Sequence, residues 1–183
     1  MANLSIVDCG LPRQILPLAS VAARESLLIG DLRDGASVAL AGGMNPKALE
    51  LQDRTHRFFI RVIRFCEGLP KNDATFSICP QLLDAAGSTD SNYRGACKGR
   101  SHREFVAKLG VAAEEADESK GWLTALLDAG CGDRREAEIL IQEADELTRI
   151  FTASQKTARR RNAAKAAAEA TRRRRNRRLT TDD

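Results

Sequence analysis

The chain has 183 residues, which suits one domain with appendages better than two domains. Hydrophobic residues make up 43% and charged residues 30%, only 4% are aromatic, and the formal net charge is +4. This balance excludes a sheet-rich protein and favours a soluble all-α one. No apolar run reaches the ~20 residues of a transmembrane helix, and the apolar segment 15–23 lacks the basic flank of a signal peptide. We therefore expect neither a membrane protein nor a secreted one.

Residues 1–43 show no sustained hydrophobic period, because proline and glycine interrupt short apolar pieces. We expect an N-terminal extension with little structure, in which a short helix over 19–29 is the one candidate element. The pattern changes at Met44. Asn45 followed by Pro46 is a typical helix start, since asparagine caps the first turn and proline suits the first helical position.

The first helix carries two stripes. Its apolar seam recurs at steps of four and three, as in a packed helix: Leu51, Thr55, Phe58, Val62 and Phe65. A basic stripe follows beside it at similar steps: Arg54, Arg57, Arg61 and Arg64. The segment 68–70, Gly-Leu-Pro, ends the helix.

The second helix, capped by Asn72 or Asp73 and running to about Gly99, has the weakest pattern. Pro80 falls near its first turns, and the small and polar run 87–92 either kinks it or lets a neighbour approach closely. The residues expected to point inward are Phe76, Leu83, Ala86, Tyr93 and Cys97.

The third and fourth helices have strong seams and clear starts. Ser101 with Glu104 fits a capping box, and Asp133 caps the fourth helix. Both seams alternate steps of four and three: Phe105, Leu109, Ala112, Ala116, Ser119, Leu123 and Leu126, then Leu140, Ala144, Leu147, Phe151 and Ser154. Short connections between four such helices predict an antiparallel up-down-up-down four-helix bundle over residues 44–160.

The charge is concentrated at the C-terminal end. Residues 156–178 hold eleven basic residues against one acid, Glu169, whereas residues 1–155 carry a net charge of −4. The segment 163–170 is rich in alanine, so the fourth helix is expected to extend as a solvent-exposed rod. Within the Arg-rich tail 161–183, residues 172–178 are expected to be disordered or helical only on binding.

The chemistry-bearing residues form no catalytic or metal-binding pattern. The two histidines, His56 and His102, have no clustered partners, and the five cysteines form no Cys-x-x-Cys pair. Scattered cysteines are usually small buried hydrophobes and indicate a reducing, cytoplasmic setting. We expect no enzyme activity, no metal and no cofactor. The acids Glu114, Glu115, Asp117 and Glu118 are expected to pair with arginines of a neighbouring helix or subunit.

The basic stripe and the basic tail are the two features with functional meaning. The stripe is either a solvated face matched to acids of the third helix or a phosphate-binding surface. The tail attracts polyanions, because arginine grips phosphate bidentately and each contact releases a counterion; the alternative is a solubilising tail. No aromatic residues interleave with the basic ones of the tail, so binding by the tail should be largely independent of sequence.

Several segments resemble the bacterial family of four helix bundle proteins that includes proteins encoded in intervening sequences of large-subunit ribosomal RNA genes. The resemblance rests on residues 54–64, 91–97, 100–101, 104–110, 114–119 and 143–147, and it covers Met44 to about Arg160. One departure is Asp90, where many members carry proline. Residues 1–43 fall outside the resemblance, and Met44 lies where members usually begin, which suggests that these 43 residues are a start-site extension.

The resemblance implies a homopentameric ring of bundles with a basic central surface and no enzymatic activity. The related accessory protein of diversity-generating retroelements binds a reverse transcriptase and nucleic acid, so the same kinds of partner are expected here. The leading hypothesis is a non-enzymatic oligomer that associates with RNA or DNA backbone; the alternative is a protein-interaction scaffold. The candidate nucleic-acid-binding residues are Arg54, Arg57, Arg61, Arg64, Arg94, Arg100, Arg172, Arg173, Arg174, Arg175, Arg177 and Arg178.

Overall fold

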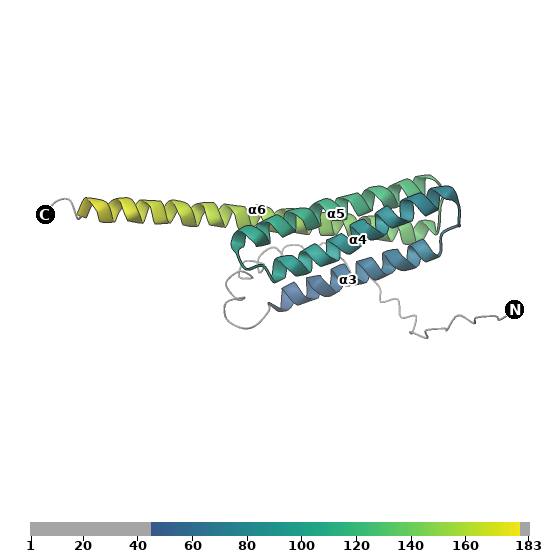
Figure 1. Ribbon diagram of the computed structural model, residues 1–183, viewed down its shortest axis with the longest axis horizontal. Helices are drawn as coiled ribbons and strands as arrows, with labels where there is room; N and C mark the ends of the chain where they lie inside the picture. Colours follow the sequence, from purple (N-terminus) through teal and green to yellow (C-terminus); the bar gives the residue numbers. More distant parts are fainter. Residues whose placement is uncertain (1–44, 180–183) are drawn as a thin grey trace.

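The computed structural model describes residues 45–179, and within this range it consists of four helices. They are α3 (Pro46–Glu67), α4 (Asp73–Cys97), α5 (His102–Asp128) and α6 (Arg134–Leu179). Each helix packs against the next, and α3 also contacts α6. The result is the predicted antiparallel up-down-up-down bundle, with the end of α6 projecting from it (Figure 1). The expectations for residues 1–43 lie outside the described range.

The predicted caps of α3 and α4 are confirmed. The side-chain oxygen of Asn45 accepts a hydrogen bond from the Lys47 N–H at 2.9 Å, and Pro46 is the first helical residue. At α4, Asn72 is the cap. Its side chain and that of Thr75 satisfy each other's backbone N–H groups.

The starts of α5 and α6 are also capped as predicted, with one difference. Ser101 accepts from the Glu104 N–H at 3.1 Å, and Asp133 accepts from the Glu136 N–H at 2.7 Å. However, the Glu104 carboxylate accepts from the backbone N–H of Arg100 at 3.0 Å. The return bond of the predicted capping box is therefore directed one residue before the cap.

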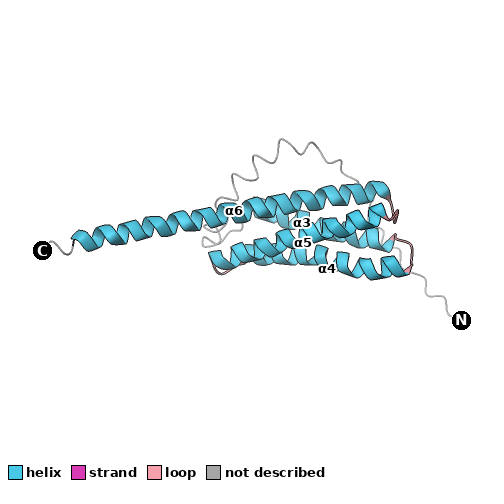
Figure 2. Ribbon diagram, turned by 90° about the horizontal axis from the view of Figure 1, so that it is seen from above, coloured by secondary structure: helices cyan, strands magenta, loops and turns pink. Residues whose placement is uncertain are grey.

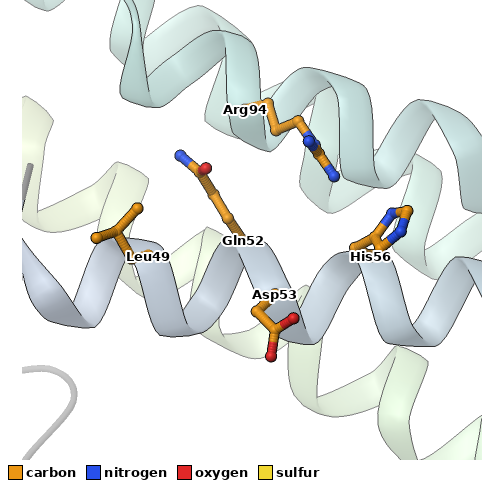
Figure 3. A pocket seen from close by; sticks show the side chains of 5 residues that line it. All are labelled: Leu49, Gln52, Asp53, His56 and Arg94. Atoms are coloured by element: carbon orange, nitrogen blue, oxygen red, sulfur yellow. The ribbon is translucent and has the colours of Figure 1, made fainter.

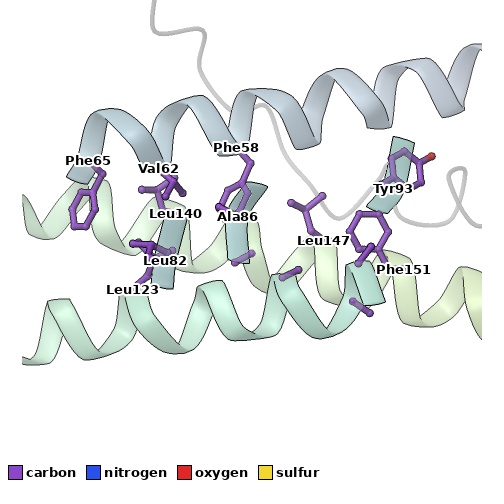
Figure 4. Close-up of a cluster of buried hydrophobic side chains, with 14 of the residues drawn as sticks. Phe58, Val62, Phe65, Leu82, Ala86, Tyr93, Leu123, Leu140, Leu147 and Phe151 are labelled. Atoms are coloured by element: carbon purple, nitrogen blue, oxygen red, sulfur yellow. The ribbon is translucent and has the colours of Figure 1, made fainter. Parts of the chain in front are cut away.

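The core contains the predicted seams of α3, α5 and α6 (Figure 4). All five seam residues of α3 are buried, as are those of α5 except the partly buried Phe105, and those of α6 except Ser154. The rings of Tyr93 and Phe151 stack with their centroids 5.2 Å apart, joining α4 to α6. Side chains at steps of three and four thus fill one continuous interior.

The predicted inward face of α4 is wrong at its start. Phe76 is 84% exposed, whereas Thr75 and Leu82 are buried and Leu83 is only partly so. The capping box turns Thr75 inward and so places its neighbour Phe76 on the surface. Further along, a Cβ added to Gly87 would lie 3.4 Å from the Phe59 ring. That is an ordinary contact distance, so Phe59 of α3 packs over Gly87 without requiring glycine at this position.

The last part of α6 is a rod outside the bundle. Ala158 is buried, and residues 159–174, as far as the structure describes side chains, are all exposed. The helix continues to Leu179, about 30 Å past the bundle at 1.5 Å per residue (Figures 1 and 2). Residues 172–178 were expected to be disordered or helical only on binding; the structure has them in α6. Extending a helix that is already nucleated adds a hydrogen bond per residue, and alanine favours that extension.

Candidate nucleic-acid interface

Arg54 forms cross-helix ion pairs inside the bundle. Its guanidinium donates to Glu143 of α6 at 2.6 and 2.9 Å and also to Glu146, whose side chain is almost fully buried. Burial opposes its charge, but the hydrogen bonds and charges of the two glutamates outweigh that effect and raise the pKa of Arg54. This arginine ties α3 to α6 and presents little of its charge to a ligand.

The rest of the basic stripe divides between ion pairs and solvent. Arg61 forms a bidentate pair with Glu136 of α6, with both hydrogen bonds at 3.0 Å. Arg57 pairs with Asp53 one turn earlier on α3 at 3.0 Å and remains 62% exposed. Arg64 is exposed. The cross-helix partners of the stripe therefore lie on α6, and the expected match to acids of the third helix is wrong.

The four acids on α5 do not serve as partners of α3. Partial burial raises the pKa of Glu115, and repulsion from Glu118, Glu114 and Asp84 raises it further. Glu118 instead accepts a hydrogen bond from the Trp122 indole at 3.1 Å. Glu114, Glu115 and Glu118 therefore lie close enough to repel one another, whereas Asp117 attracts Lys120.

A buried carboxylate, Asp90, organises the contact between α3 and α4. It accepts hydrogen bonds from the Thr55 hydroxyl at 2.8 Å and from the Arg94 guanidinium at 3.1 and 3.2 Å, and His56 Nδ1 lies 3.4 Å away. Arg94 is thereby held at the edge of a shallow surface hollow of about 240 Å³. The hollow is lined by Leu49, Gln52, Asp53, His56 and Arg94 (Figure 3). Sequence patterns did not single out Asp90 as an internal partner of Arg94.

A basic surface forms where α6 leaves the bundle. We call it the basic collar; it comprises Lys98 and Arg100 of the α4–α5 connection and Arg103 in the first turn of α5, together with Lys156, Arg159 and Arg160 of α6. His102 Nε2 donates to the Ala158 carbonyl at 2.9 Å, and Gln155 Nε2 donates to the Val106 carbonyl at 3.0 Å. These contacts fix the first turns of α5 against α6. Neither residues 98–103 nor residues 156–161 include an acid.

The collar side chains face solvent. Arg100 is 92% exposed, and its guanidinium lies 3.9 Å from the Glu104 carboxylate, which makes a long and weak ion pair. Lys98, Arg103, Lys156, Arg159 and Arg160 are exposed as well. Sequence reasoning identified Arg100 but missed Lys98 and Arg103, because the α4–α5 connection is more than fifty residues from the part of α6 beside it. Up-down-up-down topology was the available signal, since it places that connection at the end where α6 exits.

The rod continues the positive surface of the collar. Arg172, Arg173 and Arg174 are exposed, and Glu169 is the one acid between Lys156 and Arg174. Arg175, Arg177 and Arg178 follow in the same helix. Of the predicted binding residues, the structure thus gathers Arg100 and the tail arginines at one end of the molecule. Arg54 and Arg61 are instead committed to pairs with α6.

Other kinds of site find no support among the described residues. Residues 45–179 contain no group of three or more His, Cys, Asp or Glu side chains arranged to hold a metal ion. Over the same range, none of the helices combines the length and apolar character needed to cross a bilayer.

Comparison with known proteins identifies the bundle. The family model for "23S rRNA-intervening sequence protein" matches residues 47–153, more than half of the chain. A crystal structure from Bacteroides thetaiotaomicron, of a protein of unknown function from the S23 ribosomal protein family, is similar with a TM-score of 0.55 and 24% identity. That similarity covers 60% of this chain and 97% of the other, and it supports the fold alone. No curated protein matches the chain.

Proposed function

This chain belongs to the 23S rRNA-intervening sequence protein family, and from that premise we propose that it is a non-enzymatic, oligomeric bundle protein that binds the phosphate backbone of RNA or DNA. The observation that carries the proposal is the basic end of the molecule. The collar and the rod together present exposed basic side chains with few acids among them.

Charge and geometry explain how such a surface binds. Each arginine can donate two parallel hydrogen bonds to a phosphate, and neutralising a phosphate releases condensed counterions. The hydrogen bond between His102 and Ala158 holds the backbone beside Lys98, Arg100 and Arg103 against α6, so less of the backbone must be ordered on binding. A surface of this kind positions a backbone and does not read bases.

The proposal is tested by titrating the full chain against a labelled RNA oligonucleotide at several salt concentrations. If the protein contacts about six phosphates, raising the salt concentration from 50 to 200 mM should lower its affinity roughly a thousandfold. A chain ending at residue 160 keeps the bundle and the whole collar but lacks residues 161–179 of the rod, so its salt dependence apportions the contacts between the collar and those residues. If neither RNA nor DNA binds in a salt-sensitive manner, the proposal is wrong.

A second candidate is a scaffold that binds proteins. Two observations favour it: Phe76 is 84% exposed at the start of α4, and Glu114, Glu115 and Glu118 form an acidic group on α5. Exposed aromatic rings are enriched at protein interfaces. Binding of a reverse transcriptase belongs to this second proposal, whereas self-association into a ring belongs to both. Light scattering of the purified chain measures the first, and co-purification with and without nuclease separates direct protein contact from contact through nucleic acid.

A further inference from the structure

The rod lies outside the part of the chain shared with the family, because the family match ends at residue 153. It holds two basic clusters. One is at its base, in residues 156–161, and the other is at 172–174, continuing in sequence to Arg178. Between them, residues 162–171 include one lysine and one glutamate; the rest are small or uncharged.

The helix sets the distance between the clusters. Arg161 and Arg172 are eleven residues apart, or about 17 Å along the axis, and eleven residues make about three turns. Both residues therefore project from nearly the same face of the rod. A flexible tail of equal charge would hold no such spacing, whereas α6 is a continuous helix through both clusters.

Two cationic clusters at a constant separation match two rows of phosphates. The major groove of B-form DNA is about 12 Å wide and admits an α-helix, and a phosphate row borders each side. The segment between the clusters is mostly alanine, so it is thin enough to enter. The major groove of an RNA duplex is too narrow, and a single strand has no second row.

We propose that the rod binds double-stranded DNA as a preformed helix that crosses the major groove obliquely, with its two basic clusters on the phosphates at either side. This inference rests on the proposed function and narrows it to a duplex. The alanines offer no hydrogen bonds to base edges, so the rod reads the shape of the groove and not its sequence.

Ala167→Pro tests the need for a continuous helix. Proline removes a backbone donor and breaks the helix between the clusters, whereas the number of charged side chains is unchanged. Ala167→Ser is the matched control, since serine is small, uncharged and compatible with a helix. Binding of the full-length proteins to a labelled DNA duplex of about 20 base pairs is measured by fluorescence anisotropy. Ala167→Pro should weaken binding roughly tenfold, and Ala167→Ser should leave it within about twofold.

A panel of ligands separates the inference from the function on which it rests. The unaltered chain should bind the DNA duplex more tightly than an RNA duplex or single strand of equal length, and Ala167→Pro should remove this preference. Equal affinity for all three ligands, with no effect of the proline, would overturn the preformed helix while leaving the proposed function intact. Tighter binding of the RNA duplex would overturn the groove assignment. Absence of salt-sensitive binding to every ligand would overturn both.

Discussion

At the scale of single residues, Arg54 is expected to support the fold. Arg54→Ala would leave Glu146 buried without its partner and should lower the free energy of unfolding by about 2 kcal/mol. Arg57→Ala is the matched control on the same stripe. Arg57 is 62% exposed and pairs within α3, so its loss should cost less than about 0.5 kcal/mol.

Urea unfolding of both variants measures the difference, and RNA titration completes the test. Arg54→Ala is expected to leave affinity unchanged under conditions where the variant is folded. A variant of normal stability with weakened RNA binding would show instead that Arg54 serves the ligand. Arg54 would then belong among the binding residues, as its place on the basic stripe predicts.

Asp90 provides a second prediction about the interior. Asp90→Ala removes the acceptor shared by Thr55 and Arg94, so we expect a loss of about 2 kcal/mol in urea unfolding. Asp84→Ala on the same helix is the control. Asp84 is exposed and lies among the acids that raise the pKa of Glu115, so its removal should not destabilise the bundle. Equal losses in the two variants would mean that the Asp90 contacts contribute nothing specific.

Arginine spacing alone could not separate these roles. A stripe at steps of three and four shows that Arg54, Arg57, Arg61 and Arg64 share a face, but not whether acids of another helix reach that face. The packing of the helices determines which acids reach the stripe. Because α3 lies beside α6, Glu136, Glu143 and Glu146 reach the stripe and the acids of α5 do not.

At the scale of the helices, periodicity predicted most of the packing and failed where its signal was weak. The seams of α3, α5 and α6 are dominated by large apolar residues at regular steps, so their buried faces could be read directly. In α4 the buried face includes Thr75, Thr89 and Asp90, whose inward position depends on hydrogen bonds. Polar residues used in this way look like surface residues in a sequence.

The rod is expected to be helical yet to contribute nothing to the stability of the bundle. Residues 161–174 are all exposed, so ending the chain after Arg160 loses no apolar burial over the part of the rod whose side chains the structure describes. Circular dichroism should show less helical signal per molecule, while the melting temperature should change by less than about 4 °C. A larger fall would mean that the rod packs against the bundle or against another subunit. An unchanged helical signal would mean that residues 161–179 are not helical in solution.

At the scale of the whole molecule, topology creates the basic collar. The four helices alternate in direction, and this brings residues 98–103 beside residues 156–160, more than fifty residues later in the sequence. The bundle was predictable from its seams and caps. The collar required one further step, from the order of the helices to the connections that share an end.

The opposite end of α6 offers a matched control for the collar. Arg134 and Arg135 are exposed at its start, about 33 Å along the axis from Lys156. Replacing both with alanine changes the net charge by as much as replacing both Lys98 and Arg103.

If position matters, the Lys98/Arg103 double variant should weaken RNA or DNA binding. It should also reduce the slope of log affinity against log salt by about 1 for each phosphate that it no longer neutralises. The Arg134/Arg135 double variant should change neither by a comparable amount. Equal effects would show that binding responds to net charge alone, and the collar would not be a site. Both double variants remove only exposed side chains, so circular dichroism melts should confirm that each bundle is intact before affinities are compared.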